Sequence, residues 1–157
     1  MKYNSLIIIP TYNEAENIEA VIKKVIDLED KNDILVIDDN SPDGTSKIVE
    51  NQKNIHNDRV FIIKREKKSG LGSAYKAGFK WALENNYDHI VQMDADLSHD
   101  PNDVPRLVSR LKDHDLVIGS RYVNGVSVVN WPIRRLILSY GANTVSYTHL
   151  TLPTNKA

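Results

Sequence analysis

The chain has 157 residues, a formal net charge of −1 and 26% charged residues. This length is sufficient for one hydrophobic core, so we expect a single domain. The near-neutral charge gives no support for general nucleic-acid binding, and the lack of cysteine excludes disulfides and thiolate metal sites.

The apolar runs of the sequence are short. Each has only a few residues, well below the roughly 20 that are needed to span a bilayer. The first residues, Met1 to Asn4, also lack the apolar stretch of a secretory signal. The sequence as written therefore predicts a soluble, cytoplasmic protein without a transmembrane segment.

Two apolar runs in the first quarter of the chain have the pattern of buried strands. Leu6–Pro10 is closed by a proline, and the run over 34–39 ends in two carboxylates. Continuous apolar runs of this length are typical of strands that are buried on both faces of a parallel sheet. Between them, apolar residues recur at helical spacing from Ala15 to Ile26. We expect Asn13 to cap this helix, with Glu16 as the partner in a capping box.

The remainder of the sequence alternates in the same way. We expect further strands over 60–63, 90–94 and 116–122, and helices over 45–55, 71–82 and 101–111, the last capped by Asp100. Strands that alternate with amphipathic helices predict parallel βαβ units with right-handed crossovers. The predicted class is therefore α/β, with a mostly parallel sheet and helices on both faces.

The apolar run before residue 94 stops at two carboxylates, Asp94 and Asp96, one residue apart. Strand side chains alternate, so both would point to the same side if the strand continued. A hard divalent cation such as Mg²⁺ or Mn²⁺ would remove the repulsion between them. For this stretch alone, an equally good interpretation is that Asp96 and Asp100 are helix caps and Asp94 is solvated.

Polar residues follow several of the predicted strands. In open parallel sheets, ligands bind beyond the carboxyl ends of the strands. The residues at these ends are Thr11, Asp38, Asp39, Asp94, Asp96 and Arg121, with the arginine as the one cation that we expect there. A carboxylate after the second strand can accept hydrogen bonds from a base or ribose, and a metal pair after the fourth can hold a diphosphate. The pattern favours a nucleotide-diphosphate site without a Walker loop.

Five motifs in order carry a resemblance to a known family. They are Pro10–Glu14, Val36–Thr45, Gly70–Tyr75, Met93–Pro101 and Gly119–Tyr122. Together they resemble family 2 glycosyltransferases of the GT-A (Rossmann-like) fold, and in particular the dolichyl-phosphate (polyprenyl-phosphate) mannose synthases. The resemblance implies an inverting transfer of mannose from GDP-mannose to a polyprenyl phosphate lipid.

The resemblance also implies roles for single residues. The positions that would bind the nucleotide sugar are Pro10, Thr11, Tyr12, Glu14, Asp38, Asp39 and Asp94. Asp94 and Asp96 would bind Mg²⁺ or Mn²⁺ and the diphosphate. Some relatives have a glutamine as a further ligand two residues beyond the second aspartate. Ser98 stands there in this chain, so the alternatives for a third ligand are Ser98, water or His99.

The same resemblance places arginines at the acceptor phosphate. These are Arg121 and an arginine of the following segment, with Arg135 as first choice and Arg134 as second. A phosphate monoester has a second pKa near 6 and is largely ionised at neutral pH, so no strong general base is required. The catalytic candidates are therefore Asp96, Arg121 and Arg135. The segment Trp131–Tyr140 is expected to lie at the cytoplasmic membrane surface, the alternative being an ordinary helix that covers the sheet.

The resemblance covers residues 5 to about 143. We therefore expect an incomplete GT-A domain over 1–143 that lacks its C-terminal part, followed by a disordered or foreign tail over 144–157. The alternatives are a polyprenyl-phosphate glucosyltransferase or another family 2 transferase, and a non-catalytic nucleotide-sugar binding fragment. A haloacid dehalogenase-like phosphatase is a further alternative, although that family carries a pair like Asp94 and Asp96 on its first strand.

Overall fold

The computed structural model describes residues 4–28, 32–56 and 58–119. The chain divides into two compact units, Met1–Ile118 and Gly119–Ala157, and the elements below belong to the first. One sheet of four parallel strands has the order β3-β2-β1-β4. The strands are β1 (Ser5–Thr11), β2 (Asn32–Asp38), β3 (Val60–Lys64) and β4 (His89–Gln92). The helices are α1 (Ile18–Ile26), α2 (Thr45–Ile55), α3 (Leu71–Glu84), the short 3₁₀ helix η1 (Pro101–Asp103) and α4 (Val104–Arg110).

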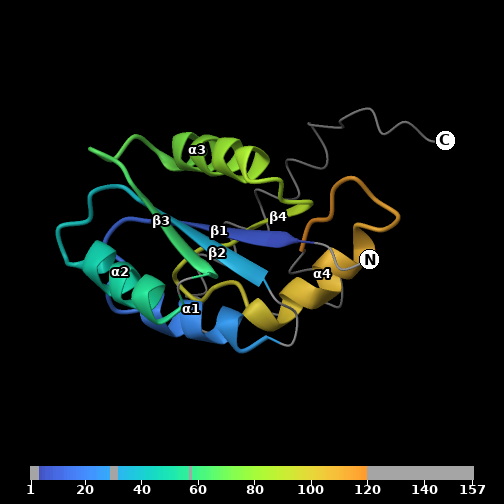
Figure 1. Cartoon of the computed structure of the whole chain (residues 1–157), viewed down its shortest axis with the longest axis horizontal. Helices are drawn as coiled ribbons and strands as arrows, with labels where there is room; N and C mark the ends of the chain where they lie inside the picture. Colours follow the sequence, from blue (N-terminus) through green and yellow to red (C-terminus); the bar gives the residue numbers. More distant parts are fainter. Residues whose placement is uncertain (1–3, 29–31, 57, 120–157) are drawn as a thin grey trace, which may run out of the picture. The chain divides into compact units, whose positions relative to one another are not determined.

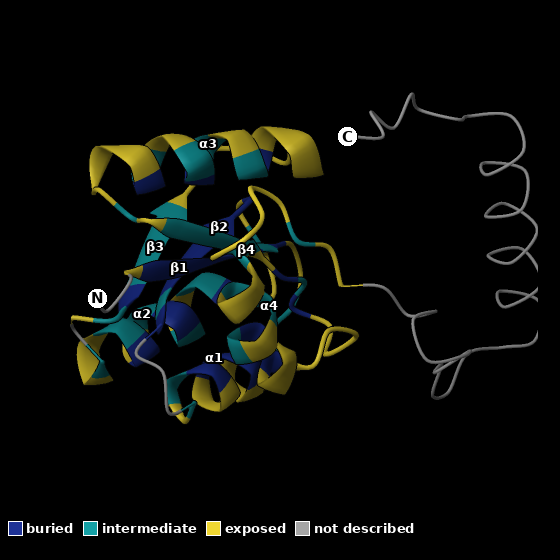
Figure 2. Ribbon diagram, turned by 90° about the vertical axis from the view of Figure 1, so that its right-hand side faces the viewer, coloured by how far each residue is buried: buried dark blue, intermediate teal, exposed yellow. Residues whose placement is uncertain are grey.

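Helices cover both faces of the sheet, as predicted. Figures 1 and 2 show α3 on one face and α1, α2 and α4 on the other. The strand order explains this arrangement. The chain moves outward from β1 to β3 through α1 and α2, and then returns past β1 to β4 through α3. Right-handed crossovers that run in opposite directions place their helices on opposite faces.

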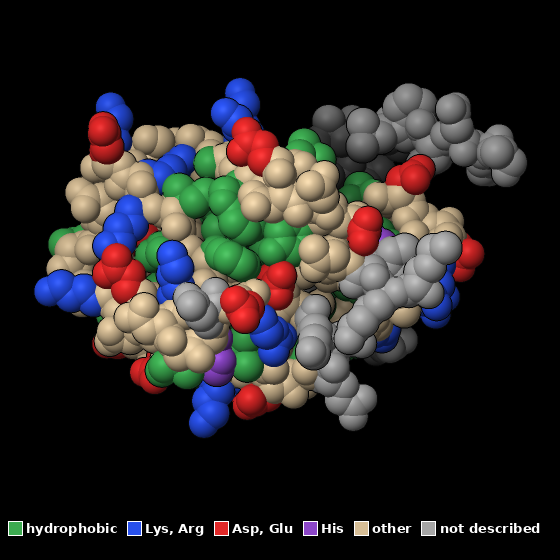
Figure 3. Space-filling view, in the orientation of Figure 1, with side chains coloured by type: hydrophobic (Ala, Val, Ile, Leu, Met, Phe, Trp, Pro, Cys, Tyr) green, Lys and Arg blue, Asp and Glu red, His purple; other side chains and the backbone are tan. Residues whose placement is uncertain are grey.

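The two central strands form the core of the sheet. Side chains in Leu6–Ile9 and Ile34–Ile37 are all fully inaccessible to solvent. Successive residues alternate between the two helical layers, as the pleat of a strand requires. On the α3 side the edge strand β3 is less enclosed, and Phe61 packs on Trp81 with ring centroids 5.0 Å apart. Figure 3 shows hydrophobic side chains gathered on the surface below α3.

Helix α3 lies unusually close to the sheet at one residue. A Cβ atom at Gly78 would lie 2.8 Å from Cγ2 and 2.9 Å from Cδ1 of Ile8. Real Cβ atoms do not approach side-chain carbons so closely, so the glycine permits this contact. The position of α3 over β1 therefore depends on the lack of a side chain at residue 78.

The start of α1 differs from the prediction. Asn13 does not cap it, because α1 begins at Ile18 and Asn13 lies in the left-handed region with φ 61°. The backbone N–H of Asn13 donates to Ser41 Oγ instead. A turn precedes the helix, in which the carbonyl of Glu14 accepts from the N–H groups of Asn17 and Ile18. The cap predicted at Asp100 is confirmed, since its carboxylate accepts from the N–H of Asn102 at 3.0 Å.

The predicted fifth strand is wrong over its described part. Residues 116–119 form no strand, and Leu116 and Ile118 are 75% and 77% exposed. A strand requires a hydrogen-bonded neighbour, and no residue in the described ranges pairs with this run. The rest of the predicted strand, 120–122, lies outside those ranges. Among the described helices, none is both long and apolar enough to cross a bilayer.

Candidate active site

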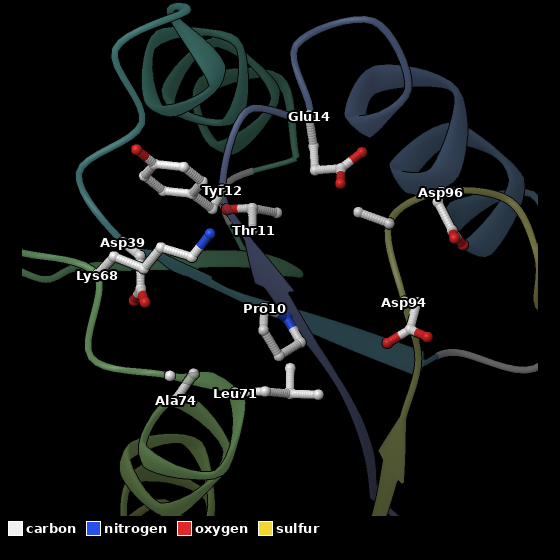
Figure 4. A pocket seen from close by; sticks show the side chains of 12 residues that line it. Pro10, Thr11, Tyr12, Glu14, Asp39, Lys68, Leu71, Ala74, Asp94 and Asp96 are labelled. Carbon is white, nitrogen blue, oxygen red and sulfur yellow. The ribbon is translucent and has the colours of Figure 1, made fainter.

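The strand order places one side of β1 at a topological switch point. β1 pairs with β2 on one edge and with β4 on the other, and the crossovers diverge between β1 and β4. Ligands of open α/β sheets bind beyond the carboxyl ends of the strands at such a point. A pocket of about 240 Å³ lies there (Figure 4). It is lined by Pro10, Thr11, Tyr12, Glu14, Asp39, Lys68, Gly70, Leu71, Ala74, Asp94, Ala95 and Asp96.

The pocket brings together most of the site predicted for the described residues. The predicted residues that line it are Pro10, Thr11, Tyr12, Glu14, Asp39, Asp94 and Asp96. Pro10 and Thr11 end β1, the other residues come from the loops after β1, β2 and β4, and the loop after β3 adds Lys68. In Figure 4, Tyr12, Lys68 and Asp39 lie on one side of the pocket and the two aspartates after β4 lie on the other.

Asp38 is not among the residues that line this pocket. Its side chain is fully buried and accepts hydrogen bonds from Thr11 Oγ1 at 2.9 Å, Ser41 Oγ at 2.6 Å and Ser46 Oγ at 2.5 Å. The N–H of Ser41 donates to the same carboxylate at 3.0 Å. A buried carboxylate is stable when several donors surround it. Asp38 therefore joins the end of β1 to the segment between β2 and the first turn of α2.

Asp39 points to the pocket and is paired with Arg65. Arg65 donates from Nε to Asp39 Oδ1 and from Nη2 to Oδ2, the latter at 2.7 Å, in a two-bond ion pair. The N–H of Ser69 donates to the same Oδ2. The hydrogen bond from Arg65 is the main cause that lowers the pKa of Asp39, against the opposing effect of burial. Asp39 is therefore an ionised acceptor held by the loop after β3.

Arg65 and Lys68 are cations that the sequence interpretation missed. It named Arg121 as the one cation near the strand ends, and the structure corrects this within the described residues. The signal was the basic run over 64–68. Lys68 Nζ lies 3.9 Å from the centre of the Tyr12 ring, which is a cation–π contact at the pocket wall. The pocket therefore has positive charge beside Tyr12 and Asp39.

Asp94 and Asp96 come from a loop, because β4 ends at Gln92, before the predicted residue 94. The N–H of Ser98 donates to Asp96 Oδ1 at 2.9 Å, and the N–H of Asp94 donates to His99 Nδ1 at 3.1 Å. Burial alone would raise the pKa of Asp96, but the hydrogen bonds from the hydroxyl and the N–H of Ser98 outweigh it and lower that pKa. Asp96 is thus held as an anion beside Asp94.

Comparison with known proteins assigns the chain to a family. The sequence matches Glycosyl transferase family 2 over residues 6–155. The chain belongs to glycosyl transferase family 2. The resemblance seen in the five motifs is thereby confirmed, and the phosphatase alternative is excluded. The predicted boundary near residue 143 remains a prediction, since the family match extends beyond it.

Curated relatives of this family include polyprenyl-phosphate mannosyltransferases. The chain is 48% identical to the polyprenol monophosphomannose synthase of Mycolicibacterium smegmatis over 143 residues, which are 90% of this chain and 54% of that protein. It is 45% identical to the undecaprenyl-phosphate mannosyltransferase of Micrococcus luteus, over 88% of this chain and 56% of that protein. The chain spans about half the length of these relatives.

A solved structure of similar fold supports the family assignment. It is the mannosyltransferase PcManGT from Pyrobaculum calidifontis in complex with GDP-Man and Mn²⁺, with a TM-score of 0.64 and 25% identity. The match covers 72% of this chain and 33% of that one. The α/β GT-A fold that the sequence predicts is confirmed.

The two aspartates after β4 form a donor set that fits a hard divalent cation. Both carboxylates line one pocket, and carboxylate oxygen is a preferred ligand of Mg²⁺ and Mn²⁺. Within residues 4–28, 32–56 and 58–119, no group of three or more His, Asp or Glu side chains is placed to hold a metal ion. Two protein ligands are sufficient for an ion that keeps water and substrate phosphate in its shell. Ser98 is not among the residues that line the pocket, and its N–H donates to Asp96.

Each loop at this candidate site contains a residue with positive φ. Asn13, Asn40 and Leu97 have φ values of 61°, 58° and 60°, and Gly70 has φ 90°. Asparagine and glycine adopt positive φ readily, whereas leucine does so with strain. Leu97 directly follows Asp96, so the strained residue lies in the loop with the candidate metal ligands.

The acceptor side of the predicted site falls on residues that the structure does not describe. Arg121, Arg134, Arg135 and the segment Trp131–Tyr140 all lie outside the described ranges. Their predicted roles stay predictions. The described half of the site is the part formed by the first four strands.

Proposed function

We propose that this chain carries the donor-binding part of an inverting mannosyltransferase that moves mannose from GDP-mannose to a polyprenyl phosphate. The observation that carries the proposal is the convergence of Tyr12, Glu14 and Asp39 with Asp94 and Asp96 on one pocket at the switch point of the sheet. The names of the curated relatives and the GDP-Man bound to PcManGT support this choice of substrates.

The charge of the pocket supports a substrate that arrives with a cation. Its lining includes Glu14, Asp39, Asp94 and Asp96, against Lys68 as the basic lining residue. Arg65 compensates Asp39, but the aspartates after β4 have no such arginine among the described residues. A diphosphate would be repelled by this surface unless positive charge accompanied it.

Asp94 and Asp96 are the residues that would hold Mg²⁺ or Mn²⁺, with Ser98 or His99 as weaker candidates for a third ligand. When bound, such an ion supplies positive charge for the leaving diphosphate. The residues of the opposite wall have a separate task. Asp39 is an ionised acceptor for donor groups of a base or ribose, Tyr12 offers an aromatic face, and Lys68 offers a cation for phosphate.

The acceptor chemistry requires mainly positioning. An oxygen of the ionised polyprenyl phosphate attacks the anomeric carbon of mannose, the bond to GDP breaks, and the configuration inverts. Arg121, Arg134 and Arg135 are the proposed phosphate ligands, since the planar fork of arginine suits phosphate oxygens. We assign peripheral contact with the cytoplasmic membrane surface to Trp131–Tyr140, where the lipid acceptor would be reached.

A thermal-shift experiment on the full chain tests donor binding. GDP, UDP, GDP-mannose and GDP-glucose are compared with and without Mn²⁺. We expect the largest stabilisation from GDP-mannose with Mn²⁺, because mass action stabilises the state that binds ligand. Asp96→Asn should abolish the metal-dependent part, and the matched control Asp113→Asn, an exposed aspartate away from the pocket, should keep it. Indifference to every nucleotide would contradict the proposal.

A transfer assay separates the enzyme from a non-catalytic binding fragment. The chain is incubated with labelled GDP-mannose, Mn²⁺ and polyprenyl phosphate in detergent, and the label that enters the organic phase is counted. We expect mannolipid in this phase, with less product from GDP-glucose. Donor binding without product under these conditions would favour the non-catalytic alternative.

A further inference from the structure

The loop that forms one wall of the pocket has its backbone held by the segment 41–45, which follows β2 and leads into α2. Asn13, Glu14 and Ala15 are three consecutive residues, and each donates its N–H to a different side chain. The acceptors are Ser41 Oγ, Thr45 Oγ1 and Asp43 Oδ2, respectively, each at 3.0 Å. Alternate residues of the 41–45 segment thus accept from consecutive residues of the 13–15 loop.

The two hydroxyls are oriented before they accept. Ser41 Oγ donates to Asp38 Oδ1 at 2.6 Å, and Thr45 Oγ1 donates to Asp43 Oδ1 at 2.6 Å. A hydroxyl has one proton, so donation to a carboxylate leaves its lone pairs for the backbone N–H. Thr45 is fully buried, and Asp38 beneath Ser41 is fully buried as well. The acceptors are therefore held in place from the core of the molecule.

The third acceptor, Asp43, is stabilised as an anion. Desolvation by neighbouring protein atoms raises the pKa of this exposed carboxyl, but the hydrogen bonds from the Thr45 hydroxyl and from the N–H groups of Ala15 and Thr45 outweigh this and lower it. An ionised carboxylate makes a stronger hydrogen bond to a backbone N–H than a neutral group does.

This arrangement has a consequence for the pocket. The N–H groups of a loop beyond a strand often bind phosphate directly. Those of residues 13–15 are already used by protein acceptors, so they are not offered to a ligand. Their contribution is to fix the backbone that carries Tyr12 and Glu14 into the pocket, including the left-handed conformation of Asn13.

We propose that Ser41, Asp43 and Thr45 are positioning residues for the donor nucleotide: they do not touch it, and they hold Tyr12 and Glu14 in the arrangement that binds it. The proposal rests on the proposed function, because it assumes that the pocket takes a nucleotide sugar. It assigns the polar run after β2 a role in preorganising the neighbouring loop.

Paired variants of the full chain test the proposal. Ser41 and Ser46 both donate to Asp38, but Ser41 alone of these two accepts from the 13–15 loop. We expect Ser41→Ala to weaken GDP-mannose binding in the presence of Mn²⁺ by about fivefold to tenfold, the worth of one hydrogen bond. Ser46→Ala should leave this affinity within about twofold of the wild type. Calorimetric titration measures both.

Thr45 allows a test at the buried position. Thr45→Val keeps the volume and removes the acceptor, whereas Thr45→Ser keeps the hydroxyl. We expect Thr45→Val to weaken donor binding by a similar factor and Thr45→Ser to restore it. Should Thr45→Val not fold, the comparison of Ser41→Ala with Ser46→Ala still tests the positioning role.

Hydrogen exchange provides a readout that does not depend on the donor. The N–H groups of residues 13–15 should exchange faster in Ser41→Ala and Thr45→Val than in Ser46→Ala and Thr45→Ser. If the wild type binds neither GDP-mannose nor GDP, the proposed function fails, and unchanged exchange rates in all variants would overturn the positioning role separately. Equal donor affinities for Ser41→Ala and Ser46→Ala would also overturn it.

Discussion

The carboxylate of Asp38, at the end of β2, is surrounded by protein donors, whereas that of Asp94, beyond β4, faces a pocket and solvent. Asp38 is fully buried and accepts from three hydroxyls and one N–H group. The side chain of Asp94 is 45% exposed, and its Oδ2 lies 3.9 Å from Nε2 of His99. The difference lies in how much of each carboxylate the protein itself satisfies. A satisfied carboxylate joins parts of the fold, and an unsatisfied one is available to a ligand.

The largest expected effect is on folding stability at Asp38. Asp38→Ala removes four hydrogen bonds and leaves the buried hydroxyl of Thr11 and two partly buried serine hydroxyls without this acceptor, so we expect a loss of at least about 3 kcal/mol in the free energy of unfolding. Urea denaturation of the full chain measures it. Asp94→Asn is the matched control and should change stability by less than about 0.5 kcal/mol. Similar losses at both positions would remove the distinction between the two loops.

Replacing Arg65 should have the next largest effect on folding stability. Its partner Asp39 combines the two cases, since it is hydrogen-bonded by the protein and also lines the pocket. Arg65→Met removes two charged hydrogen bonds to a carboxylate that is 8% exposed. We expect a loss of about 2 kcal/mol in the free energy of unfolding. Lys67→Met, in the same basic run but exposed, should have little effect. A loss no larger than that of Lys67→Met would show that the pair contributes nothing.

The pH dependence of stability provides a second test of the ion pair between Arg65 and Asp39. The pKa of Asp39 is lowered in the folded protein, so its pairing stabilises the fold above the ordinary value of 3.8. This contribution is lost as the pH falls through the lower pKa of the folded state. The difference in unfolding free energy between wild type and Arg65→Met should therefore shrink below about pH 3.8. A difference that stays constant down to pH 2 would contradict the assignment.

The smallest expected effect concerns backbone strain. Asn40 after β2 and Leu97 after β4 have nearly the same positive φ, 58° and 60°. Asparagine tolerates this conformation better than leucine, so Leu97→Asn should raise the unfolding free energy by a few tenths of a kcal/mol. Asn40→Leu should lower it by about 1 kcal/mol. Thermal unfolding compares the two, and a loss of stability in Leu97→Asn would contradict strain at this residue.

Local patterns in the sequence were sufficient for most of the fold and for the pocket walls. The limits of α2 and the start of α3 follow from helical spacing, and the buried strands follow from continuous apolar runs. The sequence patterns did not predict that Asp38 is a buried hydrogen-bond acceptor or that Arg65 pairs with Asp39. Their partners lie in other loops, as in the pair of Asp39 with Arg65, which are 26 residues apart in the chain. Such pairs form only after the sheet has aligned the strand ends. The fifth strand failed for the same reason, because an apolar run without a neighbour in the described residues is not a strand.

The contact between Gly78 and Ile8 sets the distance between α3 and the sheet. The first turns of α3 carry Leu71 and Ala74, which line the pocket, and Gly78 rests on β1 one to two turns further on. A larger residue at position 78 would move α3 away from the sheet, and Leu71 and Ala74 would move with it. The width of the pocket therefore depends on a glycine that does not itself line the pocket.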